Sequence, residues 1–108
     1  MPEARNRQPD CLFCKIVAGE IPAKLVLQTE RYTAFHDIAP QAPVHALVVS
    51  NTHSASHLET EDPQVFLDLL EGARAVAREL GLTDYRLIVN NGAGAGQSVF
   101  HMHMHVLA

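Results

Sequence analysis

The segment His101-Met102-His103-Met104-His105-Val106-Leu107 is the stretch from which the rest of the chain can be interpreted. Histidines alternate with apolar residues, and successive side chains of a β-strand point to opposite faces of a sheet. The alternation predicts a strand with His101, His103 and His105 on one face and apolar side chains on the other. Unpaired imidazoles are costly to bury, and neighbouring imidazoles disfavour each other's protonation. Three on one face indicate a metal site, an anion site or a proton-transfer site.

The composition is that of a single globular domain. The chain has 108 residues, of which 47% are hydrophobic and 19% charged. No apolar run reaches the roughly 18 residues that a membrane-spanning helix needs. The polar start lacks the apolar core of a signal peptide, so a cytoplasmic protein with no membrane partner is expected. The net charge of −4 argues against DNA or long RNA as the main partner, because phosphate backbones are bound by basic faces.

The beginning of the chain divides into an arm and a domain. Residues 1–9 contain two prolines and no apolar periodicity, which predicts a disordered arm before a single domain over residues 10–108. Apolar residues at helical spacing then predict a short helix over residues 11–18. Cys11 and Cys14 would share one face of it. Their spacing leaves open half of a metal site, two buried inert thiols or, less favoured because no strand precedes them, a redox pair.

The pattern in the middle of the chain predicts strands joined by turns. Residues 24–28 and 32–36 are rich in β-branched, aromatic and aliphatic side chains and predict a hairpin. Two prolines within residues 37–43 exclude a central strand and predict a shaped loop. Residues 44–49 are apolar enough for a strand buried on both faces, with His45 as the exception at its start.

A long helix and a further strand precede the histidines. Asp62 followed by Pro63 is typical of a helix start, and a continuous apolar stripe predicts that the helix runs to Leu80. A strand is expected over residues 85–89.

The glycine-rich segment over residues 90–98 matches neither a P-loop nor a dinucleotide fingerprint. Its simplest interpretation is a flexible hairpin tip. Glycines at alternate positions would also let backbone N–H groups approach an anion, and Ser98 would add a hydroxyl donor close to the histidines.

These patterns resemble the histidine triad superfamily, and within it the Hint branch of purine nucleoside phosphoramidases. The superfamily signature His-Φ-His-Φ-His-Φ-Φ, with Φ apolar, is met throughout residues 101–107. Further matching segments, in Hint-branch order, are Phe13-x-Lys15-Ile16, Glu20-Ile21-Pro22-Ala23, Ala34-Phe35-His36-Asp37-Ile38, Pro40-Gln41-Ala42-Pro43-x-His45 and Asn90-x-Gly92-x-x-x-Gly96-Gln97-Ser98-Val99. The resemblance implies an α+β fold, an antiparallel sheet of about five strands with one short N-terminal helix and one long helix, that pairs as a homodimer.

The same resemblance implies a nucleotide-binding hydrolase. It would cleave nucleoside 5′-phosphoramidates or related adenylates at the α-phosphorus, through a covalent nucleotidyl-histidine, and release a purine nucleotide such as AMP or GMP. His103 matches the nucleophile. His105 would donate to the phosphate or help protonate the departing amine. His45 would complete a histidine chain that orients the nucleophile, and Ser98 would stabilise charge on the phosphoryl oxygens.

A nucleotide pocket follows from the resemblance position by position. Asp37 matches the residue that takes the ribose hydroxyls. The residues that match the apolar clamp around the base are Leu12, Phe13, Ile16 and Ile38. Those on the phosphate side are Asn90, Gly96, Gln97 and Ser98, together with His103 and His105.

Some superfamily members hold zinc with a C-x-x-C pair and two histidines, and the matching residues here are Cys11, Cys14, His53 and His101. Two thiolates and two imidazoles would fill a tetrahedral Zn²⁺ site with no open position, so the ion would be structural and not needed for the chemistry. His101 would then take no part in proton transfer.

Two other functions remain open at this stage. In one, His101, His103 and His105 together bind a catalytic metal in a hydrolase. In the other, the chain is a non-catalytic nucleotide-binding or scaffold protein. The sequence does not assign roles to His36 and His57, nor does it choose between adenosine and guanosine.

Overall fold

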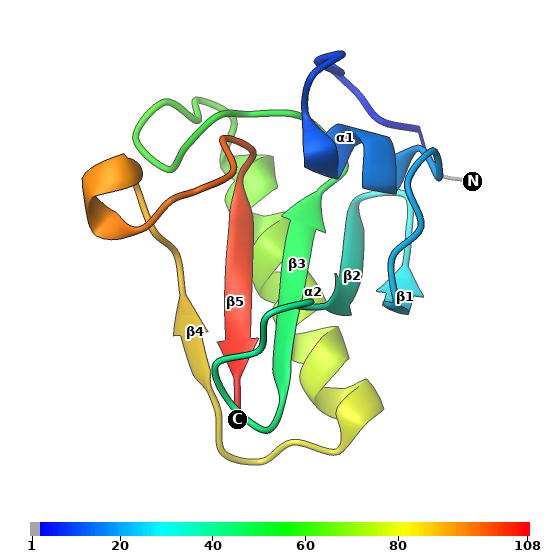
Figure 1. Cartoon of the computed structure of the whole chain (residues 1–108), viewed down its shortest axis with the longest axis vertical. Coiled ribbons are helices and arrows are strands. Elements are labelled where there is room, and N and C mark those ends of the chain that lie inside the picture. The colour runs from blue at the N-terminus through cyan, green and yellow to red at the C-terminus, as the bar shows by residue number, and fades with distance from the viewer. Residues whose placement is uncertain (1–2) are drawn as a thin grey trace.

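The computed structural model describes residues 3–108. Its elements, in order, are helix α1 (Leu12–Val17), strands β1 (Leu25–Gln28), β2 (Tyr32–His36) and β3 (His45–Ser50), helix α2 (Pro63–Leu80), strand β4 (Arg86–Ile88), the 3-10 turn η1 (Ala93–Ala95) and strand β5 (His103–Leu107). The strands form one antiparallel sheet in the order β1-β2-β3-β5-β4 (Figure 1). The α+β fold expected from the sequence is confirmed. None of the helices over the described residues is both long and apolar enough to cross a membrane.

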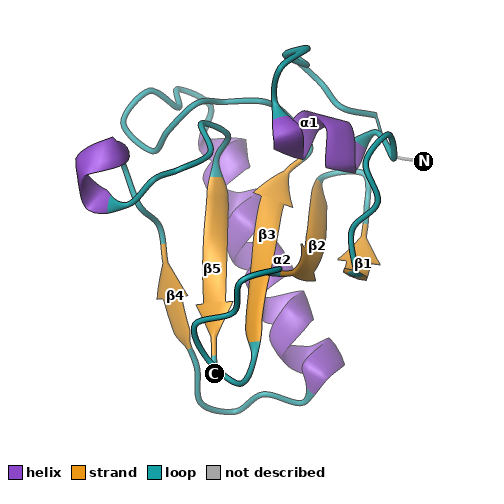
Figure 2. Cartoon of the chain, in the orientation of Figure 1, coloured by secondary structure: helices purple, strands orange, loops and turns teal. Residues whose placement is uncertain are grey.

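The two helices pack on opposite faces of the sheet (Figure 2). Ala46 and Val48 of β3 belong to the core cluster beneath α2, whereas Leu47 and Val49 belong to the cluster that contains Phe13 of α1. This is the alternation of a strand that is covered on both sides. The prediction of a fully buried strand is confirmed, since every residue of β3 is buried.

Strand β5 places its histidines and its methionines on different faces. His103 pairs with Val49 and His105 with Leu47, so both histidines lie on the α1 face, while Met104 packs in the cluster beneath α2. The alternation in the sequence predicted this arrangement, with the histidines on one face of the strand and the apolar side chains packed on the other.

The predicted strand is wrong at its beginning, because β5 starts at His103 and His101 precedes it. The partner strand β3 ends at Ser50. Beyond that point the N–H of Met102 donates to the carbonyl of Ser54 at 2.7 Å. The backbone therefore leaves the regular ladder, and His101 turns away from the other two histidines of the triad.

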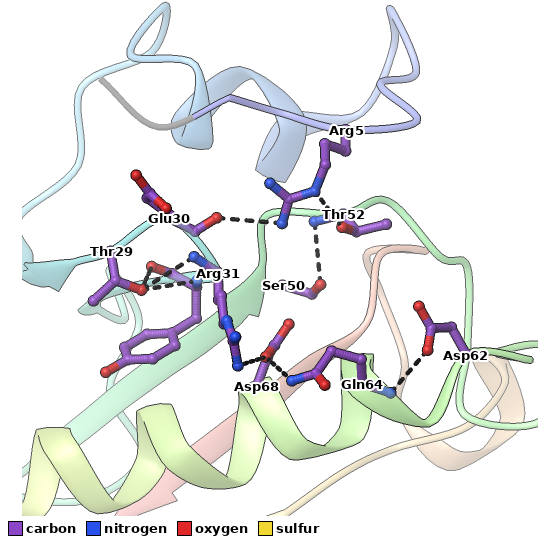
Figure 3. Close-up of polar contacts among 10 residues, drawn as sticks. Arg5, Thr29, Glu30, Arg31, Ser50, Thr52, Asp62, Gln64 and Asp68 are labelled. Carbon is purple, nitrogen blue, oxygen red and sulfur yellow. Dashed lines mark hydrogen bonds and ion pairs between the residues drawn. The ribbon is translucent and has the colours of Figure 1, made fainter.

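Contacts at Arg5 join part of the N-terminal arm to the sheet (Figure 3). The Arg5 guanidinium donates to Thr52 Oγ1 at 3.0 Å and to the Glu30 carbonyl at 3.2 Å. The disorder predicted for residues 1–9 stays a prediction, and so does the single domain over residues 10–108. Residues 1 and 2 lie outside the described residues.

The start of α2 is held by side chains, as Figure 3 also shows. The Asp62 side chain accepts from the Gln64 N–H at 2.9 Å, which is the N-cap predicted from the sequence. The Gln64 side chain donates to Asp68 at 2.8 Å. Arg31, from the turn between β1 and β2, lies 3.9 Å from the same buried carboxylate. These contacts connect the first turns of α2 to the turn of the β1–β2 hairpin.

Helix α2 packs closely against the sheet at Gly72. A Cβ there would lie 2.4 Å from Cγ1 of Val48 and 3.0 Å from Cδ1 of Tyr32. Gly72→Ala is expected to lower the free energy of unfolding by about 1–3 kcal/mol, because overpacking outweighs the helix propensity gained with alanine. Urea unfolding measures this. The control Gly94→Ala, whose Cβ would meet nothing within 4 Å, should change stability by less than about 0.5 kcal/mol. Equal stability of Gly72→Ala and the unchanged protein would contradict the contact.

Candidate functional site

A cavity of about 350 Å³ opens between α1, the end of β2 and the start of β5. Most residues that the sequence assigns to nucleotide binding line it, namely Leu12, Phe13, Ile16, Asp37, Ile38, Ser98, His103 and His105. Residues from three separate parts of the chain, namely α1, the segment that follows β2, and residues 98–105, thus meet in one cavity. Asn90, Gly96 and Gln97 are not part of its wall, and neither is His45.

The cavity wall also contains residues that the sequence analysis did not select: Ile21, Pro22, Ala23, Lys24, Phe35, His36, Leu47 and Val99. Phe35 and Leu47 lie opposite each other in the β2–β3 ladder. They share the face of the histidines, so strand alternation identifies them once the register is known. Ile21 and Pro22 belong to a segment that carries the family resemblance, which is the signal that could have marked them.

His101 is held in one protonation form by the end of β3. Its Nε2 lies 2.6 Å from the carbonyl oxygen of Ser50. A carbonyl can only accept, so Nε2 carries the proton and Nδ1 carries a lone pair. Burial, the largest cause, lowers the pKa of His101 to about 4, so the ring is neutral near pH 7.

His103 is oriented by the backbone carbonyl two residues before it. Its Nδ1 lies 2.6 Å from the carbonyl oxygen of His101, so Nδ1 donates and Nε2 is left with a free lone pair. Burial lowers the pKa of His103. A neutral imidazole with a free lone pair, in the wall of a cavity, is a nucleophile that needs no separate base to remove a proton from it.

His45 and His105 form a direct contact, with His45 Nε2 2.9 Å from His105 Nδ1. The N–H of Gln41 donates to the other nitrogen of His45, Nδ1, at 3.0 Å. Asp37 Oδ2 lies 3.4 Å from His45 Nε2. Burial lowers the pKa of His105. His45 therefore lies behind His105 and contacts it rather than the cavity; the orienting role that the family resemblance implies for His45 stays a prediction.

Phe13 connects the cavity to the histidines. Its ring packs edge-to-face against His103, with centroids 5.0 Å apart, and against His101 and Phe35 at 5.9 and 5.7 Å. The side chain is only 4% exposed. Phe13 restricts the rotation of the His103 ring and also forms part of the cavity wall.

Four side chains converge behind α1, and they are the four predicted metal ligands: Cys11, Cys14, His53 and His101. His101 Nδ1 lies 3.3 Å from Cys11 Sγ, 3.5 Å from Cys14 Sγ and 3.1 Å from His53 Nδ1. Nitrogen and sulfur ligands of a tetrahedral zinc ion with ordinary bond lengths are about 3.3–3.8 Å apart. The three distances from His101 Nδ1 fit a Zn²⁺ ion within a few tenths of an ångström, and all four ligand atoms lie within 4.8 Å of one another.

The chemistry of the donors fits zinc as well. His101 turns its lone pair toward the cluster and donates its other N–H to a backbone carbonyl, which is the usual support of a metal-binding histidine. Burial raises the pKa of Cys14 to about 11, so the metal-free thiol is neutral. A bound metal ion would deprotonate it. Both cysteines are free thiols in the structure.

The structure places the three histidines of the triad in two different clusters, His101 among the possible metal ligands and His103 and His105 in the cavity wall. Among the described residues, no group of possible metal ligands contains His101, His103 and His105 together. Asp37, His45 and His105 form a second possible group. There the Gln41 N–H occupies His45 Nδ1, so the proton of the neutral ring lies on the nitrogen that would have to bind the metal. That geometry disfavours a metal ion in the cavity.

Gln97 has a role inside the protein. Its side-chain oxygen accepts from the Gly92 N–H at 2.8 Å, and its amide donates to the Ala55 and Val99 carbonyls at 2.7 and 3.2 Å. The side chain holds the glycine-rich segment in place. Gly96, at φ +95°, adopts a conformation that favours glycine. The segment forms η1 instead of a simple hairpin tip, and Ser98 follows it at the cavity rim.

Comparison with known proteins gives consistent matches. A family model described as HIT domain matches residues 18–108. A HIT-like protein of Synechocystis is 44% identical over 101 residues, which are 91% of this chain and 89% of that protein. A HIT family hydrolase from Clostridium thermocellum superposes with a TM-score of 0.90 at 40% identity, covering 94% of this chain and 92% of that one.

Two further solved structures are similar over most of the chain. A histidine triad nucleotide-binding protein from Candida albicans has a TM-score of 0.82 at 32% identity, covering 90% of this chain and 73% of that one. A zinc-bound histidine triad family protein from Mycobacterium smegmatis has a TM-score of 0.81 at 32% identity, covering 91% and 73%.

Proposed function

The chain belongs to the HIT domain family, and from that premise we propose that it is a nucleotide hydrolase of the Hint type. It would cleave nucleoside 5′-phosphoramidates or related adenylates at the α-phosphorus and release a purine nucleoside monophosphate. The observation that carries the proposal is the free Nε2 lone pair of the buried His103 in the cavity wall. Similar solved proteins named as a hydrolase and as a nucleotide-binding protein support this assignment.

The reaction would proceed in two displacements at phosphorus. In the first, His103 Nε2 attacks the α-phosphorus, and the leaving group departs with the electron pair of its bond, an amine taking up a proton as the bond breaks. The product is a nucleotidyl-His103 intermediate. In the second, water attacks the same phosphorus and releases one proton in turn, together with the nucleoside monophosphate and the neutral imidazole. The Nδ1–H of His103 donates a hydrogen bond to the His101 carbonyl throughout. This hydrogen bond stabilises the positive charge on the substituted ring.

The remaining residues of the cavity would bind the nucleotide. Asp37 stands at its mouth as an acceptor for the ribose hydroxyls, and the hydroxyl of Ser98 lies at the rim where a phosphoryl oxygen would sit. Leu12, Phe13 and Ile16 present the apolar wall of α1 to the base. Asn90, Gly96 and Gln97 would act by shaping the segment before Ser98, which is consistent with the hydrogen bonds of Gln97.

Ile38 offers a test of base binding that is separate from folding. Its side chain is fully exposed although it lines the cavity. Ile38→Ala is expected to raise the Kd for AMP by about tenfold, because a base would bury an isoleucine worth roughly 1.5 kcal/mol or more. The melting temperature should not change. Calorimetric titration measures the affinity. Leu58→Ala, at an exposed leucine that does not line the cavity, is the matched control. An unchanged Kd for Ile38→Ala would remove Ile38 from the base clamp.

A structural zinc ion is the second part of the proposal. Cys11, Cys14, His53 and His101 would hold it, and when bound it ties α1 to the segment before β5 without entering the reaction. The zinc-bound relative from Mycobacterium smegmatis supports this assignment. Catalysis should therefore survive metal removal as long as the protein stays folded.

Pairing of two chains, expected from the resemblance, is also a proposal. The three-residue β4 is an edge strand on which Leu87 is 41% exposed, and Leu67 and Leu70 of α2 are about half exposed. These apolar side chains are consistent with burial against a second copy. Sedimentation at several concentrations would measure the assembly, and a monomer at all of them would contradict it.

The decisive experiment is a single-turnover assay with an adenosine 5′-phosphoramidate. The protein is in excess over the substrate, and its concentration is above the Kd of the complex. AMP release, together with a transient increase of the protein mass by one adenylyl group, is the expected result. Binding of AMP without release or adduct would instead indicate a non-catalytic nucleotide-binding protein. Neither binding nor turnover would contradict the nucleotide assignment as a whole.

A further inference from the structure

The four possible metal ligands are held in different ways by the rest of the protein. The Ser50 carbonyl fixes the ring of His101, and the Cys14 N–H donates to Cys11 Sγ at 3.4 Å at the start of α1. His53 lies beyond the end of β3. Within the described residues, the hydrogen-bonding partners of its ring are Cys14 and His101, both members of the same cluster. The position of His53 therefore depends on what holds its backbone.

The backbone of His53 is held by Arg5. The His53 N–H donates to the Arg5 carbonyl at 2.7 Å, and the Arg5 N–H donates to the Asn51 carbonyl at 2.9 Å. Arg5 thus forms a parallel β-bridge with Thr52. Its guanidinium adds the hydrogen bonds to Thr52 Oγ1 and to the Glu30 carbonyl (Figure 3). One residue of the N-terminal arm therefore holds the chain on both sides of Thr52.

The segment on which Arg5 docks is itself well anchored. Asn51 is fully buried, its amide donates to the Thr29 carbonyl at 2.7 Å, and its side-chain oxygen accepts from the Thr33 hydroxyl at 2.8 Å. A shift of Asn51 would break these buried hydrogen bonds, which is costly. Arg5 therefore docks on a fixed base.

The same arm also reaches the segment that carries the cysteines. The Gln8 carbonyl accepts from the Cys11 N–H at 3.1 Å, directly before α1. Only two residues separate Gln8 from Arg5. Residues 5–8 therefore join the segment of His53 to the start of α1 by protein contacts alone.

We propose that Arg5 is a positioning residue for metal binding, which holds His53 in place for a zinc ion and makes the N-terminal arm part of the zinc site. The inference rests on the zinc part of the proposed function. Metal binding costs free energy for every ligand that must be ordered first. While Arg5 is docked, His53 is already ordered, as the other three ligands are. The site is therefore fully preorganised only with the arm in place.

Replacement of Arg5 tests the proposal through metal affinity. Arg5→Ala is expected to raise the Kd for Zn²⁺ by about tenfold, as for other residues that support metal ligands. All four ligands remain, and Arg5 is exposed, so the fold should be kept. Competition with a chromophoric chelator measures the Kd on the folded protein. An unchanged Kd would overturn the proposal.

Thr52 provides a test that leaves the net charge unchanged. Thr52→Val removes the oxygen that accepts from Arg5 and should raise the Kd for Zn²⁺ about threefold, as for one lost hydrogen bond. The matched control Thr52→Ser keeps that oxygen and should bind Zn²⁺ like the unchanged protein. Because both changes act on one contact, Thr52→Val should add nothing to the effect of Arg5→Ala. Full additivity would show that Arg5 acts independently of Thr52 and would overturn the proposal.

Cobalt distinguishes a positioning residue from a ligand. Co²⁺ held by thiolates and imidazoles has visible absorption bands that depend on the ligand set and its geometry. At saturation Arg5→Ala should give the spectrum of the unchanged protein, and only the concentration of Co²⁺ that it needs should be higher. His53→Ala removes a ligand and should change the bands. A changed spectrum for saturated Arg5→Ala would overturn the proposal, because Arg5 would then determine the ligand set itself.

Thermodynamic linkage gives a second measurement, on the arm. If docking of the arm strengthens zinc binding, zinc must strengthen docking by the same factor. Trypsin can cleave after Arg7 only when the arm opens, so saturating Zn²⁺ should slow this cleavage about tenfold in the unchanged protein and little in Arg5→Ala. Intact mass follows the loss of residues 1–7. Equal cleavage of the unchanged protein with and without Zn²⁺ would overturn the proposal.

Failure of the zinc assignment gives a different result from failure of this inference. If neither Zn²⁺ nor Co²⁺ binds to the unchanged protein, the zinc assignment is wrong and the role of Arg5 is overturned with it. If both ions bind equally well to Arg5→Ala, only the role of Arg5 is overturned. The hydrolase assignment is unaffected in either case.

Discussion

His103→Ala is expected to lower the single-turnover rate of AMP formation by at least about 10⁴-fold, because loss of a covalent nucleophile removes the first chemical step. The adenylyl adduct on the protein should disappear at the same time. AMP should still bind, since Asp37 and the wall of α1 are unchanged. Rapid quench with intact-mass measurement follows product and adduct in one experiment.

The matched control is His57→Ala. His57 is an exposed histidine that packs beside Phe66 and does not line the cavity. Its replacement should leave both the rate and the adduct as they are. An adduct that persists in His103→Ala, or a loss of less than tenfold, would place the nucleophile on another residue. A melting curve for each variant separates misfolding from loss of chemistry.

Metal removal has the second large expected effect, and it acts on stability. An ion present at about a thousand times its Kd adds about 4 kcal/mol to the free energy of unfolding. For a chain of this length that corresponds to a melting temperature about 15 °C higher than that of the metal-free protein. Removal of one zinc per chain by a chelator should reverse the increase. Elemental analysis measures the zinc content per chain, and calorimetry measures the melting temperature.

Cys14→Ser separates this effect from unspecific action of the chelator. Cys14 is fully buried in the ligand cluster. The variant should contain no zinc, melt at the temperature of the metal-free protein and show no further change with chelator. Below that temperature the saturating rate of the folded variant should stay within about tenfold of the unchanged protein. A rate that falls with zinc content while the protein remains folded would contradict a purely structural ion.

Much of the fold could be predicted because it depends on local patterns. The stripe that ends at Leu80 predicted α2 with its correct bounds, since an amphipathic helix must bury that stripe. Alternation in residues 103–107 predicted which face of β5 packs beneath α2 and which faces the cavity. The start of β5 was predicted too early, because a strand extends only as far as its partner β3, and sequence periodicity does not contain the partner's length.

The amino-acid sequence by itself determined which chemical groups are available: three histidines near the end of the chain, a C-x-x-C pair near its start, and the residues that resemble a nucleotide pocket. Only the tertiary structure decided how each group is used. It brought His101 to Cys11 across 90 positions of sequence. It also chose the protonated nitrogen of each ring through Ser50, His101 and Gln41. The physical reason is that a tautomer is set by the nearest backbone donor or acceptor, and folding determines which one that is.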